Sequence, residues 1–456
     1  MYEQPIQPGE TWFFARLRRH LGELARLAAP TIVSRLGVLM IVQVDAVMVG
    51  HAGTAELAAL NLGNAVTTNL IVLGMGLLMG TLVLSANAFG AGDHRECGAV
   101  WRRALPYALC IGLVGFACAF QGQTLMALLG QKGDLASGSG AVVRIMAFGI
   151  PPVLLFLATN FFLESLRRPV PGMVLMLLAN LVNVALNWLF IYGIGPLPAM
   201  GAEGAALATT IVRYGVCAGA IAYVWWLLPD RDAFGVRQAP PRDAEAERRQ
   251  RRIGYATGFG IGAESVSFTA MVMFAGWLGE LSAAAYGIAF NLLALFFMAA
   301  IGVGSATSVR VGIAYGRRDH PDLVLAGWTG LGANTVLALL FAVLIFTQAD
   351  GLAALYTGDP ALRAVAAGLV SLVAVVLVLD GGQAVMAQAL RGRRDVWVPM
   401  AFQTVSYLAV MLPLGWIWAF RWGAGVDGLM LTVLAASLLS LTLQASRFAW
   451  LARRPL

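Results

Sequence analysis

Charged side chains are scarce in this sequence. Asp, Glu, Lys and Arg make up 12% of its 456 residues, about half the fraction found in ordinary soluble proteins. Apolar residues make up 59%, and the mean hydropathy is +0.76. The chain has too few polar residues to cover a water-facing surface, which excludes a soluble globular enzyme and indicates that most of the chain faces lipid.

Residues that carry metal, redox or catalytic chemistry are also few. The four cysteines form no Cys-x-x-Cys pair and the four histidines show no metal-ligand spacing, so neither a disulfide framework nor a metal site of that kind is expected. P-loop, phosphate-binding and nucleophile motifs are missing as well. We expect no enzyme activity and no cofactor. Because the net charge of +7 is spread over short loops, we also expect no nucleic-acid partner.

Long apolar runs are plentiful and alternate with charged or Gly/Pro-rich joints. About 20 helical residues cross a hydrocarbon core of roughly 30 Å, and continuous apolar runs favour α-helices over a barrel of short alternating strands. The sequence predicts an all-α integral membrane protein with twelve transmembrane helices. The expected spans are residues 28–50, 57–88, 104–122, 141–163, 172–193, 204–228, 254–278, 283–313, 326–347, 364–388, 398–420 and 426–450.

Lys and Arg are distributed unequally between the loops. With the N-terminus inside, 24 of the 31 lie in inner segments, and only Lys132, Arg363 and Arg421 lie in outer ones. Short loops rich in Lys and Arg stay in the cytoplasm. We therefore expect a multi-pass protein of the cytoplasmic (inner) membrane, with both termini and the arginine-rich stretch 229–253 in the cytoplasm.

The two halves of the chain form an internal repeat. A shift of 226 residues aligns Thr81–His94 with Thr307–His320, with six of fourteen positions identical, where residue frequencies would give roughly one. We expect an N-terminal lobe at 1–228, a cytoplasmic linker at 229–253 and a C-terminal lobe at 254–456. Six spans are an even number, so the two six-helix lobes form a parallel repeat, an arrangement typical of transporters with a substrate site at the repeat interface.

Three acidic residues lie inside predicted spans, namely Asp45, Glu264 and Asp380. Each charged form costs about 2.5 to 3.5 kcal/mol at mid-membrane, and intramembrane carboxylates commonly carry protons or small cations. Each could instead be neutral and hydrogen-bonded, or line an aqueous cleft without taking part. Glu264 and Asp380 belong to the same half and could share one cavity.

Asp45 belongs to the other half, where the fifth span offers polar company. The candidate partners are Asn180, Asn183 and Asn187. A fourth acid, Glu164, lies near a helix end beside Arg167 and Arg168, and we expect it to reach the cytoplasmic interface.

Several motifs together carry a resemblance to a known family. They are Ala29-Pro30, Val44-Asp-Ala-Val-Met-Val-Gly50, Asn183-Val-Ala-Leu-Asn-Trp188, Gly254 with Glu264 ten residues on, Ser308-Val-Arg-Val-Gly312, Asp380-Gly-Gly-Gln-Ala-Val385 and Leu390-Arg-Gly392. Over essentially its whole length the chain resembles the multidrug and toxic compound extrusion (MATE) transporters, and within them the NorM-like branch. The resemblance implies an antiporter that exports organic, often cationic and amphipathic compounds such as drugs in exchange for sodium ions or protons.

The resemblance also implies roles for particular residues. Glu264 and Asp380 match the cation-coupling carboxylates of the C-terminal lobe, and they would hold sodium if sodium is the coupling ion. Asp45, Asn183 and Asn180 match the cation or proton site of the N-terminal lobe. Where many relatives have His-Gln, this chain has Tyr286-Gly287, so no substrate-binding residue is assigned.

Other functions remain open at this point. The duplicated lobes also resemble lipid-linked sugar flippases of the same superfamily, which more often have extra spans and basic cavity residues. An ion channel is disfavoured because no filter-like motif and no short pore helix is visible in the sequence. The expected partners are small organic substrates and membrane lipids, and the expected oligomeric state is a monomer.

Overall fold

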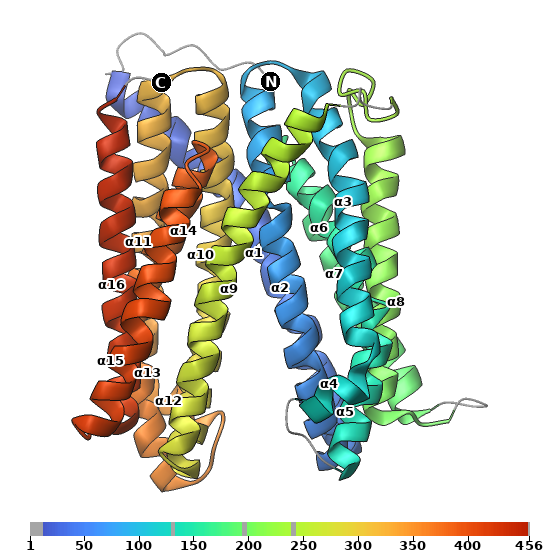
Figure 1. Ribbon diagram of the computed structural model, residues 1–456, viewed down its shortest axis with the longest axis vertical. Coiled ribbons are helices and arrows are strands. Elements are labelled where there is room, and N and C mark those ends of the chain that lie inside the picture. Colours follow the sequence, from blue (N-terminus) through green and yellow to red (C-terminus); the bar gives the residue numbers. More distant parts are fainter. Residues whose placement is uncertain (1–11, 129–132, 194–197, 239–242, 455–456) are drawn as a thin grey trace. The chain divides into compact units, whose positions relative to one another are not determined.

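The computed structural model describes residues 12–128, 133–193, 198–238 and 243–454, and nearly all of them are helical (Figure 1). The helices are α1 Trp12–Ala52, α2 Thr54–Gly90, α3 His94–Phe120, α4 Gly122–Leu128, α5 Gly133–Ala147, α6 Ile150–Ser165, α7 Val170–Tyr192, α8 Gly201–Ala222, α9 Ala244–Trp277, α10 Glu280–Gly316, α11 His320–Thr347, α12 Ala349–Ala354, α13 Pro360–Gly392, α14 Trp397–Thr404, α15 Leu412–Trp416 and α16 Gly425–Ala452. Three π-helical segments extend or interrupt them, namely η1 Tyr223–Leu227, η2 Val405–Met411 and η3 Ile417–Arg421. Lys132, expected in an outer segment, lies outside the described residues.

The membrane-spanning character of the chain is confirmed. Among the described residues, eleven helical stretches are long and apolar enough to cross a membrane, and a bent pair of helices would be the twelfth. Most expected spans coincide with a helix that extends several residues beyond them. The largest extension is at α1, which begins sixteen residues before the expected residue 28.

The expected span 141–163 is broken into two helices. Leu135–Ala147 and Ile150–Ser165 meet at an angle of 46°. Two prolines, Pro151 and Pro152, explain the break, because proline has no N–H to donate to the preceding turn and its ring clashes with the carbonyl there. In the second half the helix α13 is unbroken, and the positions 226 residues after the two prolines are Leu377 and Val378.

The internal repeat extends to helix lengths and turns. α2 and α10 are both 37 residues long and begin 226 residues apart. The turns that follow them have the same design, in which Asp93 accepts a hydrogen bond from Glu96 N and Asp319 accepts one from Asp322 N. An aspartate at this position caps the next helix by satisfying one of its free N–H groups. The internal repeat seen in the sequence is therefore also present in the secondary structure and in the helix caps.

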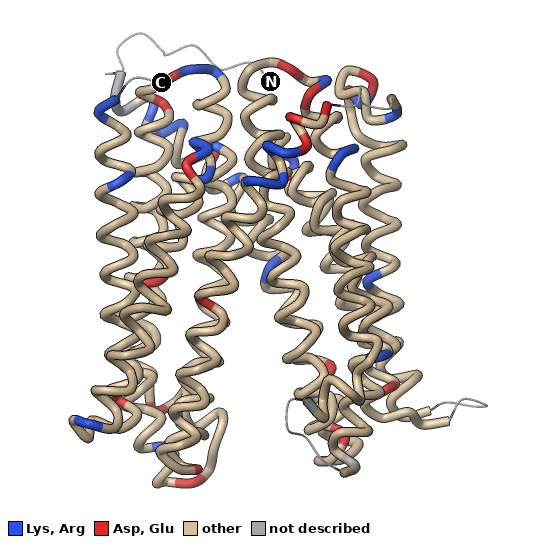
Figure 2. Tube along the Cα trace, viewed as in Figure 1, with Lys and Arg blue, Asp and Glu red and all other residues tan. Residues whose placement is uncertain are grey.

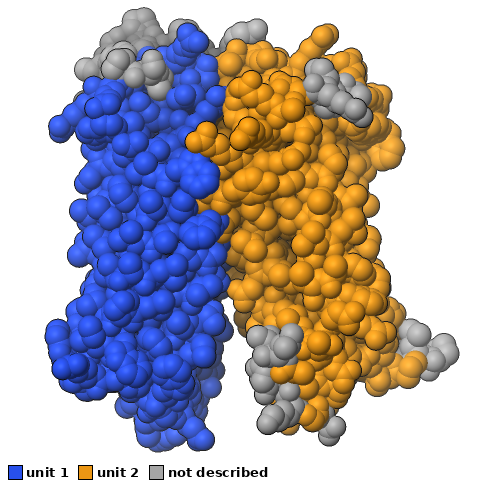
Figure 3. Space-filling view, viewed as in Figure 1, with its two compact units in different colours: residues 1–32, 259–456 blue, residues 33–258 orange. Residues whose placement is uncertain are grey.

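The described residues form two compact units (Figure 3). One contains the described residues of the ranges 12–32 and 259–454, and the other contains those between 33 and 258. α1 therefore starts in the unit that holds the second half of the chain, and α9 starts in the unit that holds the first half. α1 passes from one unit to the other after Ile32, and α9 does so after Gly258. These two positions are again 226 residues apart, so this feature is part of the internal repeat. The lobe boundaries expected from the sequence, at residues 228 and 254, do not include this passage of α1 and α9 between the units.

Glycines allow the first parts of α1 and α9 to pack closely against other helices of the same unit. A Cβ added to Gly254 on α9 would lie 2.0 Å from the Leu77 carbonyl oxygen on α2, and one added to Gly302 on α10 would lie 2.4 Å from the Ile32 side chain on α1. Gln250 on α9 also donates to Thr81 Oγ1 and to the carbonyl of Val100, both at 3.2 Å. Close backbone approach through small residues is a common way to pack helices in lipid.

Each unit has its own apolar core. In the unit that contains the second half, α13 packs against α10, α11 and α16. In the other unit, α2 packs against α3, α5, α6 and α8. Within each unit, most Lys and Arg residues gather toward one end, and few lie along the middle of the helices (Figure 2).

Candidate cation-coupling site

Glu264 on α9 and Asp380 on α13 are brought to one place in the unit that contains the second half. Gln383, three residues after Asp380 and therefore on the same face of α13, joins them. Its side-chain nitrogen donates to Glu264 Oε1 at 3.3 Å and to Asp380 Oδ1 at 3.4 Å. Asp380 is buried, with 2% of its surface exposed, whereas Glu264 is partly exposed.

Asp380 has further hydrogen-bond donors. Tyr407 donates its hydroxyl to Asp380 Oδ1 at 2.8 Å, and Ser437 on α16 donates to the same oxygen at 2.9 Å. Tyr407 lies in the π-helical segment η2. π-helical turns are rare and occur frequently at functional sites, where they change the direction of a side chain. Asp380 is therefore held by α13, η2 and α16 together.

A second glutamine, Gln403, is hydrogen-bonded both to Glu264 and to the buried Arg391. Gln403 on α14 donates to Glu264 Oε2 at 3.5 Å, and its own side-chain oxygen accepts from Arg391 Nη2 at 2.9 Å. Further polar side chains surround Gln383, because Ser440 and Gln444 both donate to its side-chain oxygen at 3.3 Å. The two carboxylates thus belong to a connected polar core among apolar helices.

The electrostatics of the pair favour capture of a cation. Because both carboxylate oxygens accept from one nitrogen, they lie within about 7 Å of each other, where two unit charges repel by about 2 kcal/mol at an effective dielectric constant of about 20. A proton on either group, or a small cation between them, removes this repulsion. Carboxylate, hydroxyl and amide oxygens are also the ligands that hard cations prefer.

Among the described residues, no metal site can be built from acids, histidines and cysteines alone. In the part of the chain that the structure describes, no three such residues are close enough to hold a metal ion. A sodium ion at Glu264 and Asp380 would therefore need other oxygen ligands, and the hydroxyl groups of Tyr407 and Ser437, both hydrogen-bonded to Asp380, are candidates.

Asp45 on α1 forms a second polar site, in the unit that contains the first half. It is buried, with 1% of its surface exposed. Asn187 on α7 donates to Asp45 Oδ1 and Thr209 on α8 donates to Oδ2, both at 2.6 Å. Asn183 joins the same group, since it accepts from Asn187 and donates to Thr209, both at 3.2 Å. Arg213, one turn beyond Thr209, adds a favourable charge interaction with Asp45.

Asn180 does not join this group among the described residues. Its amide nitrogen donates to the carbonyl of Gly37 on α1 at 3.0 Å and to that of Met176 at 2.8 Å. It therefore ties α7 to α1 at a point three residues, slightly less than one helical turn, before Asn183.

Glu164 was expected at the cytoplasmic interface beside Arg167 and Arg168, and this expectation is wrong. Its side chain is buried, accepts from Asn160 at 2.7 Å and forms an ion pair with Arg35 on α1 at 3.6 Å. A buried carboxylate needs a partner in a medium of low dielectric constant. Arg35 supplies it from a distant part of the sequence.

Several residues at these sites were not expected from the sequence. Tyr407, Ser437 and Thr209 lie within apolar spans, and nothing in their local pattern connects them with a carboxylate. Gln383 did have a signal, because its spacing from Asp380 places both on one helix face. The acids themselves are not repeated, since the position 226 residues after Asp45 is Met271 and the position 226 before Glu264 is Val38.

Comparisons with known proteins give the same family for both halves. The sequence matches the MatE family at residues 30–189 and 257–417. It is 37% identical over 430 residues, 94% of this chain and 91% of the relative, to a Caulobacter vibrioides protein named "Probable multidrug resistance protein NorM". It is 32% identical over 415 residues, 88% of this chain and 84% of the relative, to the multidrug resistance protein PmpM of Pseudomonas aeruginosa.

Solved structures show the same fold at lower identity. The outward-facing conformation of a multidrug resistance MATE family transporter of the MOP superfamily matches with a TM-score of 0.87 and 20% identity, covering 97% of this chain and 99% of that one. The eukaryotic MATE transporter AtDTX14 matches with a TM-score of 0.86 and 16% identity, covering 96% and 98%. The repeated halves, the polar sites in the spans and these matches lead to one conclusion: the chain belongs to the MatE family of multi-pass membrane transporters.

Proposed function

We propose that this protein is a multidrug efflux antiporter that exports organic, cationic amphipathic compounds in exchange for sodium ions or protons. Its relatives carry names that refer to multidrug resistance. The observation that carries the coupling part of the proposal is the pair Glu264 and Asp380, joined by Gln383 within membrane-spanning helices. Secondary transporters hold their coupling ions at such polar groups within the membrane.

The pair would couple the two fluxes through its charge. With both carboxylates ionised, the site attracts a cation from outside, and the membrane potential assists entry by about 2.3 kcal/mol per charge per 100 mV. Binding of one proton or sodium ion removes one of the two negative charges of the pair and weakens its attraction for a cationic substrate. Release of the substrate to the outside then accompanies uptake of the coupling cation.

Alternating access would follow from the two-unit construction. Two long helices, α1 and α9, each contribute residues to both units, and each changes unit at equivalent positions of the repeat. Because cation-bound and substrate-bound states differ in the charge of the site, they can favour opposite openings of the two units. A ligand shifts such an equilibrium only through this kind of differential affinity.

The proposed orientation places both chain ends and residues 243–252 in the cytoplasm. The support is the distribution of Lys and Arg, most of which lie in alternate loops. The proposed location is the cytoplasmic (inner) membrane.

The deciding experiment is dye efflux from vesicles that contain the purified protein, with sodium and proton gradients imposed separately. Export driven by one of these gradients, and its loss in Glu264→Gln, would support the proposal. As a matched control, Glu280→Gln changes an exposed acid at the start of α10 in the same unit and should transport normally. Export that depends on neither gradient would show that the protein is not a cation-coupled antiporter.

A further inference from the structure

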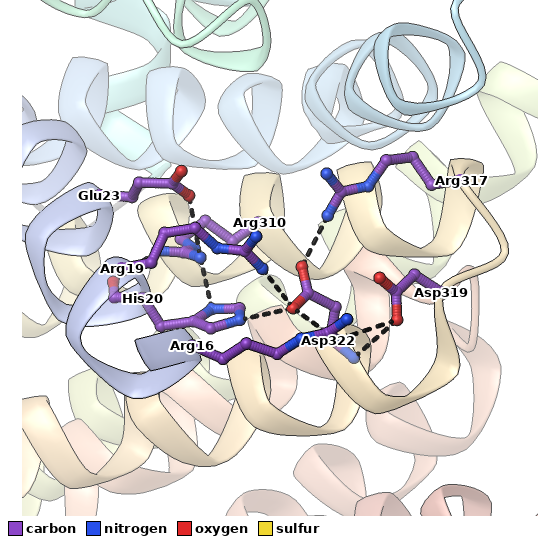
Figure 4. A network of polar contacts seen from close by, with 8 residues as sticks. All are labelled: Arg16, Arg19, His20, Glu23, Arg310, Arg317, Asp319 and Asp322. Carbon is purple, nitrogen blue, oxygen red and sulfur yellow. Dashed lines mark hydrogen bonds and ion pairs between the residues drawn. The ribbon is translucent and has the colours of Figure 1, made fainter. Parts of the chain in front are cut away.

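Two groups of buried charges lie in the unit that contains the second half of the chain. One is the ionic cluster at the start of α1, in which Asp322 accepts from Arg19 and from Arg317, both at 2.6 Å (Figure 4). Its arginines therefore have carboxylates in direct contact. The other group contains Arg391 near the end of α13, whose charge is compensated in a different way.

Arg391 is buried, with 4% of its surface exposed. Among the described residues its guanidinium forms no direct ion pair, and its hydrogen-bond partner is the side-chain oxygen of Gln403, at 2.9 Å. A guanidinium stays protonated in proteins, and a buried charge is costly unless an opposite charge compensates it. The counter-charge of Arg391 must therefore lie beyond Gln403.

Gln403 connects this charge to Glu264. Because a guanidinium can only donate, the Gln403 oxygen faces Arg391 and its nitrogen faces Glu264 Oε2, to which it donates at 3.5 Å. A Cβ added to Gly260 on α9 would lie 2.7 Å from the same Gln403 oxygen, so this glycine leaves room for the amide. Arg391, Gln403 and Glu264 thus form a chain of hydrogen bonds that ends on the carboxylate.

Both oxygens of Glu264 accept hydrogen bonds in this arrangement. Oε2 accepts from Gln403, and Oε1 accepts from Gln383. The orientation of Gln383 is fixed as well, since its own oxygen accepts from Ser440 and Gln444. Hydrogen bonds donated to a carboxylate favour its charged form. The surroundings of Glu264 therefore suit an ionised side chain.

Arg391 is closer to Glu264 than to Asp380. One amide group contacts both Arg391 and Glu264, so their charged groups lie within about 9 Å, and they attract each other through their charges. Asp380 precedes Arg391 by eleven residues on the same helix, which places their backbones about 16 Å apart. Because Coulomb attraction falls with distance, Arg391 compensates the charge of Glu264 more than that of Asp380.

Asp380 differs from Glu264 in burial and in its neighbours. It is 2% exposed, whereas Glu264 is partly exposed. Its donors are the neutral groups of Tyr407, Ser437 and Gln383, which all bond to Oδ1. A deeply buried carboxylate with only neutral donors is costlier to keep ionised than one compensated by a guanidinium. A proton or small cation therefore gains most at Asp380.

The remaining side chains that the structure places against the pair are uncharged. They are Tyr407 of η2, Ser437, Ser440 and Gln444 of α16, and Ala300 of α10 and Asn334 of α11, which lie against the residue after Asp380. Tyr407 is the ionisable group in this set, and it donates its hydroxyl to Asp380. The counter-charge in these surroundings is therefore that of Arg391.

We propose that Arg391 is a positioning residue for cation coupling, which acts through Gln403 to keep Glu264 ionised while Asp380 takes up and releases the coupling cation. Two carboxylates and one guanidinium leave a single negative charge, which one proton or one sodium ion cancels. This inference rests on the cation-coupled function proposed above. It adds the member of the pair that exchanges the cation and the residue that holds the other member charged.

The first test measures the unfolding temperature of the purified full-length protein against sodium concentration at fixed pH, and against pH without sodium. Arg391→Gln should lower the half-saturating concentration of the coupling cation about tenfold, because it removes a positive charge that opposes the cation. Arg391→Lys keeps the charge and should stay within about twofold of the wild type. The matched control Arg453→Gln removes an exposed arginine of the same unit and should change nothing.

An arginine with only a structural role would give a different result. Its loss would lower the unfolding temperature without the cation and leave the half-saturating concentration as it was. That result in folded Arg391→Gln, together with cation-dependent stabilisation of the wild type, would overturn this proposal alone. A wild type whose unfolding temperature responds to neither cation would overturn the proposed cation coupling as well.

A second measurement needs no change at Arg391. Infrared difference spectra recorded during acidification in sodium-free buffer show the C=O stretching band of each carboxyl group that takes up a proton. The first band from the pair should be lost in Asp380→Asn and kept in Glu264→Gln. Loss of this band in Glu264→Gln and its retention in Asp380→Asn would show that Glu264 takes up the proton, and would overturn the proposal.

Discussion

The strongest test of the coupling site is a pair of charge-neutralising changes at Glu264 and Asp380. In the wild type, the two ionised carboxylates lie within about 7 Å and repel by about 2 kcal/mol. A free energy of 1.4 kcal/mol corresponds to a tenfold change in an equilibrium constant. Relief of this repulsion therefore raises the affinity of the site for one cation roughly 30-fold. Both Glu264→Gln and Asp380→Asn remove this driving force as well as one anionic ligand.

We expect each single variant to lose nearly all cation-driven efflux. Each should also lose the rise in unfolding temperature that the wild type shows when the coupling cation is added, which at 100 times the dissociation constant corresponds to about 2.7 kcal/mol. The double variant should be little worse than either single variant, because the site already fails when one member is lost. The interaction energy in this double-mutant cycle should therefore be about 2 kcal/mol or more.

The assay measures unfolding temperature against sodium concentration and against pH, together with efflux from vesicles. Glu280→Gln serves as the control for loss of one acid in the same unit. Losses that add within a few tenths of a kcal/mol would mean two independent sites. Export against a gradient by Glu264→Gln would refute the shared-site reasoning outright.

Two further predictions concern the other polar sites, and a third concerns the orientation of the chain in the membrane. Asp45→Asn should impair transport more than folding, because the amide keeps partners in Asn187 and Thr209 but cannot exchange a proton or carry charge; normal gradient-driven efflux would make Asp45 purely structural. Arg35→Leu should lower the free energy of unfolding by about 3 to 5 kcal/mol, since it leaves Glu164 buried without its ion-pair partner. Adding Glu164→Gln to that variant should recover most of the loss, which thermal unfolding can measure. A cysteine at position 245 should resist an impermeant thiol reagent applied outside intact cells, and labelling from outside would reverse the proposed orientation.

Much of the fold could be predicted from the sequence. Apolar runs of about 20 residues can satisfy their backbone groups in lipid only as helices, so most expected spans coincide with helices. The duplication was visible in the aligned ranges Thr81–His94 and Thr307–His320, in which Asp93 and Asp319 cap α3 and α11 in the same way. Pro151 and Pro152 could also have predicted the break before α6, but the apolar run around them is long enough for one span and was therefore expected to form a single helix.

The division of the chain into units could not be predicted in the same way. Residues 12–32 and 244–258 look like ordinary beginnings of helices, and their local pattern does not say which core they join. Their packing depends on glycines at Gly302 and Gly254, which acquire meaning only when another helix lies against them.

The candidate site divides along the same line. The rarity of acids in apolar spans identified Asp45, Glu264 and Asp380, because an isolated charge in lipid is costly wherever the helix packs. Their partners Thr209, Tyr407 and Ser437 were not identifiable, since a lone hydroxyl is tolerated in any membrane helix by bonding to its own backbone.

The sequence by itself determined that this chain is a membrane protein of two similar halves with acids inside its spans. Those properties depend on hydrophobicity and period, which are local. Only the tertiary structure decided that Gln383 joins two of the acids, that Asn180 lies apart from Asp45 and that Glu164 is paired with Arg35. Hydrogen bonds and ion pairs form over about 3 to 4 Å, and distances of that size between residues a hundred or more apart in sequence depend on how the helices pack.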